Sequence, residues 1–158
     1  LEEVKMMLVK NYDFKVSYSR SQTIKGFIND IKVDFIRFDY PHLFPCDDIE
    51  NIRIESIPDI IAMKLLSITD NGSRIKDFID IAFLSSRYSL NDMLNFYLKK
   101  IPNSNALMPL KALTYFEDID FKESVVMLNH AFDWTEISAR LMDMANSPNK
   151  IFPEPFST

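Results

Sequence analysis

The segment IPDIIAMKLLSITDNGSRIKDFIDIAFLSSRY, residues 57–88, decides the fold, because it predicts two amphipathic helices joined by a turn at Asn71-Gly72. Each helix carries a charge where the helical spacing of its apolar residues predicts a hydrophobic side chain. Lys64 lies at the centre of the apolar stripe of the first helix, and Asp77 begins the apolar seam of the second. A lysine in such a stripe either extends its amine to the surface or meets an anion. These two charges are therefore the main functional signal in the sequence.

The composition excludes several kinds of site. The chain has 158 residues, 47% of them apolar, which is enough for one substantial core or two small lobes. Two glycines are too few for a glycine-rich phosphate loop, and a net charge of −5 gives no general attraction to nucleic acid. The single cysteine, Cys46, excludes an internal disulfide and shows no zinc-binding spacing with the two histidines. With no signal peptide and no membrane-spanning apolar run, we expect a cytoplasmic protein without membrane contact.

Strand patterns come first along the chain. Alternating residues predict a strand that begins at Phe14, a weaker one at 23–28 with a bulge at Gly26, and the strongest at 31–38. Asn29-Asp30 predicts a two-residue hairpin turn before the strongest strand. One further short strand is predicted at 52–55.

Helical patterns follow the strands. Ser56 and Ser89 are predicted helix caps, and further helices are expected at 107–116 and from Trp134 onward. The sequence therefore predicts an α+β fold. Its parts are a small, mostly antiparallel sheet at 1–55, a helical bundle at 56–146 and an irregular tail at 147–158.

Asp34 is an acidic residue in a strand otherwise built of valine, isoleucine and phenylalanine. Such a residue is locally unfavourable in a strand, so it needs an explanation. Charged side chains on an edge strand prevent pairing with another chain, which is one interpretation. The other is a carboxylate held rigidly on a sheet to ligate a hard cation such as Mg²⁺.

Several short segments stand in an order and at a spacing found in a known family. They are Lys32–Phe35, Ala62–Leu65, Lys76–Ile81, Leu110–Asp118 and Trp134–Glu136. Together they resemble the nucleotidyltransferase AbiEii/AbiGii toxin family over most of the chain. Members are the toxin halves of bacterial and archaeal toxin–antitoxin and phage-defence systems. The resemblance implies a polymerase-β-like nucleotidyltransferase fold, of which residues 1–55 would be part of the catalytic lobe.

The resemblance also assigns roles to individual positions. Asp34 matches the carboxylate that completes the metal-binding set, and Lys64 matches the lysine near the nucleotide phosphates. Asp77 matches the aspartate of the family's basic-Asp-Phe motif. The implied catalytic residues are Asp34, Lys64 and Asp77, with Asp34 as the metal ligand. The implied nucleotide-binding residues are Lys64, Arg74, Lys76 and Asp80. Mg²⁺ and an NTP are the implied cofactors of the intact protein.

Two departures from the family pattern change the expected chemistry. Asn71 stands where the family has an arginine, and Arg74 or Lys76 would compensate. The family's opening motif, a Gly-Gly/Ser turn before a paired-carboxylate strand, is absent and is expected upstream of Leu1, which itself lies in a helical pattern. Nucleotidyl transfer needs two or three carboxylates to fix Mg²⁺. We therefore expect a truncated chain that is inactive alone and binds neither cofactor tightly.

The expected partners follow from the same resemblance. It implies an antitoxin protein and an acceptor that is either RNA or protein. The missing strands would leave the sheet with an uncovered edge or face, which a partner or self-association would cover.

Plainer alternatives remain open. Lys64 and either Asp77 or Asp80 would also pair across the helical hairpin for structural reasons alone, and Asp77 near a helix start suits the helix dipole in any case. His42 and His130 have no partners at catalytic spacing, so solvent-facing or capping roles are expected for them, and Cys46, beside acidic residues, has no feature that would lower its pKa. The alternative for the whole chain is a non-catalytic module of the same fold that only binds a partner.

Overall fold

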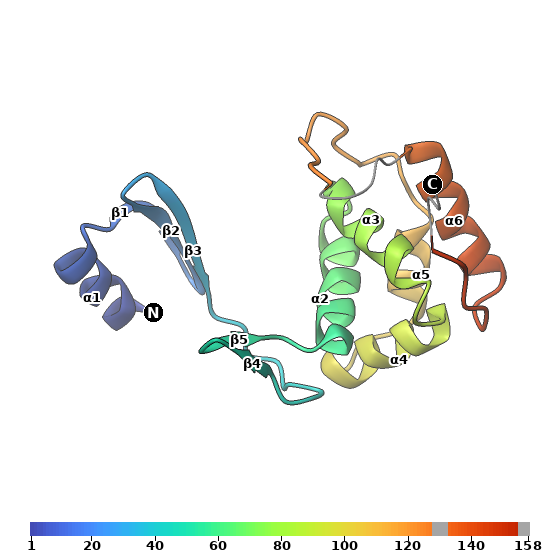
Figure 1. Cartoon of the computed structure of the whole chain (residues 1–158), viewed down its shortest axis with the longest axis horizontal. Coiled ribbons are helices and arrows are strands. Elements are labelled where there is room, and N and C mark those ends of the chain that lie inside the picture. Colours follow the sequence, from blue (N-terminus) through green and yellow to red (C-terminus); the bar gives the residue numbers. More distant parts are fainter. Residues whose placement is uncertain (128–132, 155–158) are drawn as a thin grey trace. The chain divides into compact units, whose positions relative to one another are not determined.

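The computed structural model describes residues 1–127 and 133–154, and the chain divides into two compact units, Leu1–Tyr40 and Pro41–Thr158 (Figure 1). Each unit packs around its own cluster of buried apolar side chains. Helices occur together with small antiparallel sheets, which confirms the predicted α+β class. No helix in the described part of the chain is long and apolar enough to cross a membrane.

The first unit is a helix followed by a three-stranded antiparallel sheet in the order β1-β2-β3. Its elements are α1 (Glu2–Tyr12), β1 (Lys15–Arg20), β2 (Thr23–Ile28) and β3 (Ile31–Ile36). The predicted turn is confirmed, because Asn29 and Asp30 have φ angles of 47° and 66°, as this kind of hairpin requires. The irregularity predicted at Gly26 lies in the facing strand instead, between Val16 and Tyr18.

The core of the first unit is small. Leu8 of α1, Phe14 and Ile24 are its buried members. Phe14 meets the edge of Phe35 with ring centroids 6.0 Å apart. A Cβ atom at Gly26 would lie 2.5 Å from the Phe14 ring, so only glycine allows this ring to lie against β2. The glycine is therefore required for packing.

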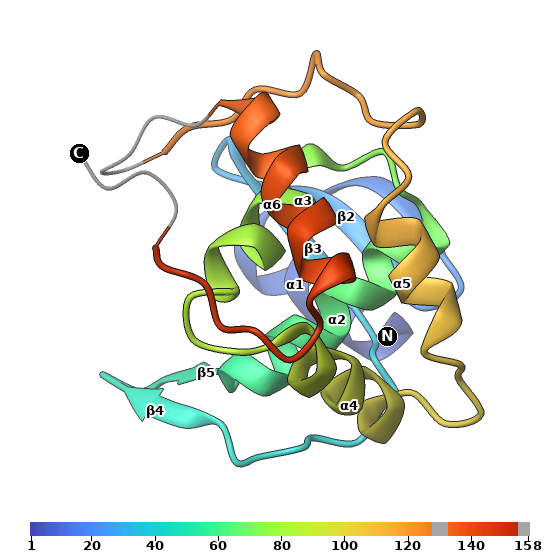
Figure 2. The same ribbon diagram turned by 90° about the vertical axis from the view of Figure 1, so that its right-hand side faces the viewer.

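The second unit begins with a two-stranded hairpin and continues as a helical bundle. Its elements are β4 (Asp47–Ile49), β5 (Ile52–Ile54), α2 (Ile57–Asp70), α3 (Ile75–Leu84), α4 (Leu90–Lys100), α5 (Leu107–Leu113) and α6 (Trp134–Asn146). Helix α2 packs against α3, α4 and α5, and α3 packs against α6 (Figures 1 and 2). The two helices predicted from residues 57–88 thus lie at the centre of the unit.

Local sequence signals explain most helix boundaries of the second unit. The Ser56 hydroxyl accepts a hydrogen bond from the N–H of Asp59, and Ser89 forms the predicted capping box with Asp92. The helix predicted at 107–116 is shorter than expected. It ends at Leu113 because the N–H of Thr114 turns back to the carbonyl groups of the preceding turn.

The units divide between Tyr40 and Pro41, whereas the sequence places the domain boundary at residue 55. The hairpin of β4 and β5 belongs with the helices because side chains anchor the segment that leads into it. The Asp59 carboxylate accepts the N–H groups of Leu43 and Phe44, at 2.9 and 3.1 Å. These are contacts between distant residues, which no local pattern reports.

The tail is irregular in its backbone but packed in place. The N–H of Phe152 donates to the carbonyl of Ser85 at 2.9 Å, and the Phe152 side chain is buried. Arg140 of α6 donates to the Ser85 hydroxyl and to the Pro153 carbonyl, at 3.0 and 2.8 Å. Residues 147–154 therefore close over the end of α3 (Figure 2, red).

Candidate functional site

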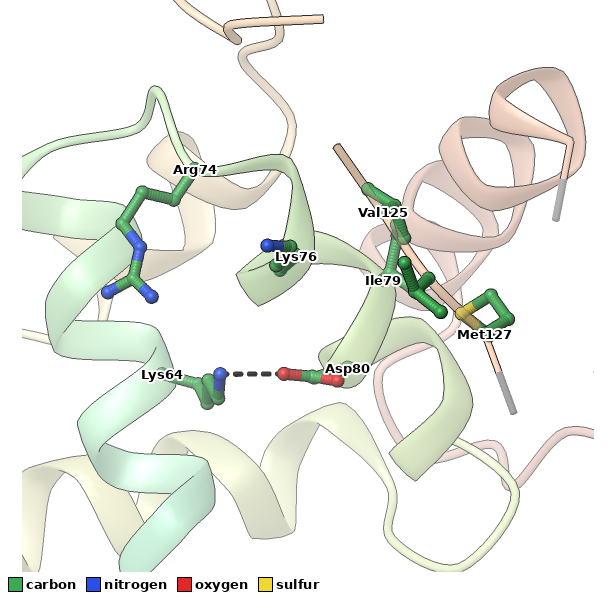
Figure 3. A pocket seen from close by; sticks show the side chains of 8 residues that line it. Lys64, Arg74, Lys76, Ile79, Asp80, Val125 and Met127 are labelled. Carbon is green, nitrogen blue, oxygen red and sulfur yellow. Dashed lines mark ion pairs between the residues drawn. The ribbon is translucent and has the colours of Figure 1, made fainter. Parts of the chain in front are cut away.

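Lys64 of α2 lies between two aspartates of α3. Its Nζ atom is 2.7 Å from Oδ1 of Asp77 and 2.6 Å from Oδ2 of Asp80. Figure 3 shows the amine directed across the gap between the helices at Asp80. The structure therefore brings together three of the residues singled out from the sequence. The two carboxylates belong to one helix face, since they are three positions apart.

Asp77 is buried and holds the cluster together. Its side chain is only 2% exposed, and Oδ2 accepts a hydrogen bond from the Ser67 hydroxyl at 2.7 Å. Arg74 places its Nε atom 3.7 Å from the same oxygen. Ser67 was not predicted from the sequence, although its position three residues after Lys64 puts it on the same face of α2.

The lysine remains charged in this environment. Burial by itself would lower the pKa of Lys64, but hydrogen bonds to Asp77 and Asp80 outweigh that effect and raise the pKa above its ordinary value. Asp80 is the replaceable partner because its side chain is 47% exposed, whereas Asp77 is enclosed. Solvent therefore reaches the Asp80 side of Lys64 more readily than the Asp77 side.

A pocket of about 190 Å³ opens beside this cluster. One part of its wall is charged and the other is apolar (Figure 3). The charged residues are Lys64, Arg74, Lys76 and Asp80, and the apolar ones are Ile79, Val125, Val126 and Met127. All four residues predicted to bind the nucleotide thus line one pocket. Their side chains form its charged wall, and no glycine-rich loop of the described residues contributes to it. Lys76 is also paired with Glu123, 3.1 Å away.

Asp34 belongs to the first unit. It lies on β3, at one edge of the three-stranded sheet, and faces Lys25 of β2 in the strand register. Its Oδ2 atom is 3.8 Å from the Lys25 amine, and a third of its side chain is exposed. The predicted strand position is thus observed, while its role as a metal ligand stays a prediction.

A second lysine–aspartate pair, which was not predicted from the sequence, lies in the interior of the second unit. Lys100 at the end of α4 is 1% exposed and places Nζ 2.5 Å from Oδ1 of Asp59, which is 0% exposed. Lys100 also donates to the carbonyl of Pro41 at 3.0 Å. Two adjacent lysines at a helix end resemble a solvated terminus in sequence, so no local signal distinguishes Lys100 from Lys99.

Four donors surround the Asp59 carboxylate: Lys100, the Ser56 hydroxyl and the N–H groups of Leu43 and Phe44. Burial alone would raise the pKa of Asp59, but these hydrogen bonds lower it to about 2. The pair is fully enclosed, which fits a role in holding the fold together.

His42 and Cys46 both contact Glu55, a cluster that was not predicted from the sequence. Nδ1 of His42 is 3.0 Å from Oε1 of Glu55, and Sγ of Cys46 is 3.2 Å from Oε2 of the same carboxylate. The hydrogen bond to Glu55 raises the pKa of the Cys46 thiol. The exposed position of His42 and the raised pKa of Cys46 agree with the sequence analysis, whereas the contact of both with Glu55 depends on the hairpin, which the sequence showed only in part. His130 lies outside the described residues.

The charged lysine and the mixed polar and apolar pocket thus belong to an α+β chain. The chain matches the family described as nucleotidyl transferase AbiEii toxin, type IV toxin–antitoxin system, over residues 13–153. It belongs to this family, which confirms the resemblance found in the sequence. No curated protein and no solved structure matches the chain.

Proposed function

We propose that the chain is the nucleotide-binding part of a nucleotidyltransferase toxin. The observation that carries the proposal is Lys64, a cation fixed by buried Asp77 and exposed to a pocket that already contains Arg74 and Lys76. Lys64 would bind the NTP phosphates by exchanging Asp80 for a phosphate oxygen. Asp77 would position the amine.

The rest of the pocket supports the same ligand class. Arg74 and Lys76 add positive charge at the rim, which attracts the remaining phosphate charge. Ile79 and the segment 125–127 supply an apolar surface, against which the uncharged part of a nucleotide can pack. This combination suits an NTP better than a free phosphate, because a free phosphate has no apolar part.

The donor set in this chain does not by itself fit Mg²⁺. Mg²⁺ requires near-octahedral oxygen ligands, and catalytic sites for nucleotidyl transfer supply two or three carboxylates. Asp34 is the one carboxylate that the family pattern places here, and Lys25 lies within 3.8 Å of it. We therefore propose that these 158 residues bind NTP weakly, and that nucleotidyl transfer needs carboxylates in addition to Asp34.

The proposed reaction would join an acceptor to the nucleotide. A hydroxyl oxygen of an RNA or a protein would bond to the α-phosphorus, pyrophosphate would leave, and the hydroxyl proton would pass to solvent or a base. An antitoxin protein is the partner that the family implies.

Isothermal titration of the chain with each of the four NTPs in the presence of Mg²⁺ tests the proposal. Lys64→Met is expected to weaken binding of the preferred NTP at least tenfold. Lys99→Met, an exposed lysine on α4 outside the pocket, is the matched control and should bind as the unchanged chain does. Equal binding by the Lys64 variant, or no binding of any NTP, would contradict the proposal.

The second candidate function is a partner-binding module without catalysis. The pairing of Asp34 with Lys25 favours it, since the carboxylate already has a counter-ion. Exposed apolar residues on the same strand, Ile31 and Ile36, add a surface for a partner. This function predicts that the reading frame upstream of codon 1 encodes no paired carboxylates and that no NTP binds. The nucleotidyltransferase proposal predicts the opposite on both points: paired carboxylates are encoded there, and an NTP binds.

A further inference from the structure

Three side chains of different chemistry converge on one point of the second unit: His42, Cys46 and Glu55. Their nitrogen, sulfur and oxygen atoms all lie within 4.8 Å of one another. The individual separations are 3.8 Å from Cys46 Sγ to His42 Nδ1, 3.2 Å from Sγ to Oε2 of Glu55, and 3.0 Å from Nδ1 to Oε1. None of these residues lines the pocket beside Lys64.

The hairpin of β4 and β5 explains why Cys46 and Glu55 lie close together. Cys46 directly precedes β4 and Glu55 directly follows β5, and the last ladder pair is Asp47 with Ile54. The two side chains therefore lie at the open end of the hairpin, on adjacent strands. Its turn has two residues with positive φ, Glu50 at 53° and Asn51 at 63°, which fixes the register that brings Cys46 beside Glu55.

The third member, His42, is held near them by the enclosed lysine–aspartate pair. The N–H of Leu43, the next residue, is bonded to Asp59, and the carbonyl of Pro41, the preceding residue, is bonded to Lys100. Nζ of Lys100 also lies 3.5 Å from Oε1 of Glu55. The cluster thus rests on a rigid internal support, as a preorganised ligand site requires.

We infer that His42, Cys46 and Glu55 form a three-ligand site for Zn²⁺. Typical distances from zinc to sulfur, nitrogen and oxygen imply ligand-to-ligand separations of about 3.4–3.6 Å in a tetrahedral site. The observed values of 3.0–3.8 Å bracket that range, so only small side-chain rotations are needed. His42 is exposed, so the fourth position faces solvent and takes water.

The ligand types select a transition metal. Imidazole and thiolate are preferred ligands of Zn²⁺, whereas Mg²⁺ takes oxygen ligands. On binding, the Cys46 thiol releases its proton to solvent, and the bond between sulfur and zinc replaces the hydrogen bond from Cys46 to Glu55. The Zn²⁺ site is therefore separate, in residues and in metal, from the Mg²⁺ chemistry proposed for nucleotidyl transfer.

Titration of the reduced chain with Zn²⁺, followed by calorimetry and by the rate at which a thiol reagent modifies Cys46, tests this inference. One equivalent of Zn²⁺ is expected to bind and to slow modification at least tenfold. Substitution with Co²⁺ should produce the charge-transfer absorption of a cobalt–thiolate bond. Mg²⁺ should do neither.

Variants separate the site from general surface binding. His42→Ala, Cys46→Ser and Glu55→Gln should each weaken Zn²⁺ binding at least tenfold, while Glu50→Gln, an exposed acid at the hairpin turn, should leave it unchanged. Circular dichroism shows whether each variant is folded, and His42→Ala removes an exposed side chain, which makes it the variant safest for the fold. If the chain binds no Zn²⁺, or if a folded His42→Ala binds it as tightly as Glu50→Gln does, the site does not exist.

Discussion

The second unit contains two lysine–aspartate pairs that differ in how far solvent reaches them. Lys100 and Asp59 are both enclosed, with exposed fractions of 1% and 0%, and the Ser56 hydroxyl and the N–H groups of Leu43 and Phe44 also donate to the Asp59 carboxylate. Lys64 and Asp77 also lie close together, but the lysine is 25% exposed and shares its charge with Asp80 at the mouth of a pocket. The first pair has no route to a ligand, and the second has one.

The difference shows what burial of a charge can mean. A buried pair whose partners are fixed by further hydrogen bonds serves the fold, because removal of one partner leaves the other charge unpaired in the interior. A lysine with one enclosed and one exposed carboxylate partner, such as Lys64, would be able to exchange the exposed partner for a ligand. Stability and binding should therefore separate cleanly between the two pairs.

Lys100→Met is expected to have the largest effect. It leaves the Asp59 carboxylate buried without a cation, which typically costs about 3–5 kcal/mol of the free energy of unfolding. Urea unfolding followed by fluorescence measures it, because Trp134 is the only tryptophan and lies in the second unit. Lys99→Met is the matched control and should change stability by less than about 0.5 kcal/mol. Similar stability in both variants would show that the enclosed pair does not hold the fold.

Acid should weaken the second unit through Asp59. The pKa of this residue is about 2 in the folded chain and 3.8 in its ordinary state, so the folded form binds its proton less readily. The stabilisation is complete above pH of about 4 and is lost as the pH falls toward 2, by about 2 kcal/mol.

The same tryptophan signal, recorded during urea unfolding at several pH values, measures this loss. Asp59→Asn cannot titrate and should lack this part of the pH dependence, even though it is less stable at neutral pH. An identical acid dependence in both proteins would assign the loss to other carboxylates.

Lys64→Met should cost less stability, about 1–2 kcal/mol, and should instead remove binding. Asp77 keeps the Ser67 hydroxyl and Arg74 as partners, and Asp80 is exposed to water. Unfolding experiments and NTP titration on the same variant measure both effects. A loss of stability equal to that of Lys100→Met, with NTP binding unchanged, would reverse the distinction between the pairs.

Asp34→Asn should have the smallest effect on stability, within about 0.5 kcal/mol, because the pair with Lys25 is exposed and 3.8 Å apart. Amide hydrogen exchange of β2 and β3 measures it. Lys25→Met removes the other partner and is the control. In an assay in which the proposed nucleotidyl transfer takes place, only Asp34→Asn should abolish transfer. Full activity of that variant would show that Asp34 is not needed for transfer, and would leave the prevention of pairing between edge strands as its interpretation.

Local signals in the sequence predicted a large part of the fold. The hairpin turn at Asn29-Asp30 and the caps at Ser56 and Ser89 depend on neighbours within a few residues, and all three are confirmed. The segment 57–88 also forms the two predicted helices. The strand at 47–49 was missed because three residues, two of them aspartates, give no alternating pattern.

The charged residues of the candidate site could be predicted from the sequence, but the residues that complete its hydrogen bonds could not. Lys64 and Asp77 stand out because each interrupts an apolar stripe. Ser67, which completes the bonding of Asp77, is an ordinary helical serine in sequence. The pairing of Lys100 with Asp59 joins residues 41 positions apart, and the cluster of His42, Cys46 and Glu55 needs the hairpin to form.

The sequence by itself determined the α+β class, most element boundaries, the family and the two helices that carry Lys64 and Asp77, because periodicity, caps and turns act over a few residues. Only the tertiary structure decided which lysine is enclosed and which faces a pocket, where the two units divide, and that a histidine, a cysteine and a glutamate meet. The physical reason is that burial and long-range pairing depend on which surfaces pack together. Lys99 and Lys100 are identical, adjacent residues, and only the packing around them makes one exposed and the other buried.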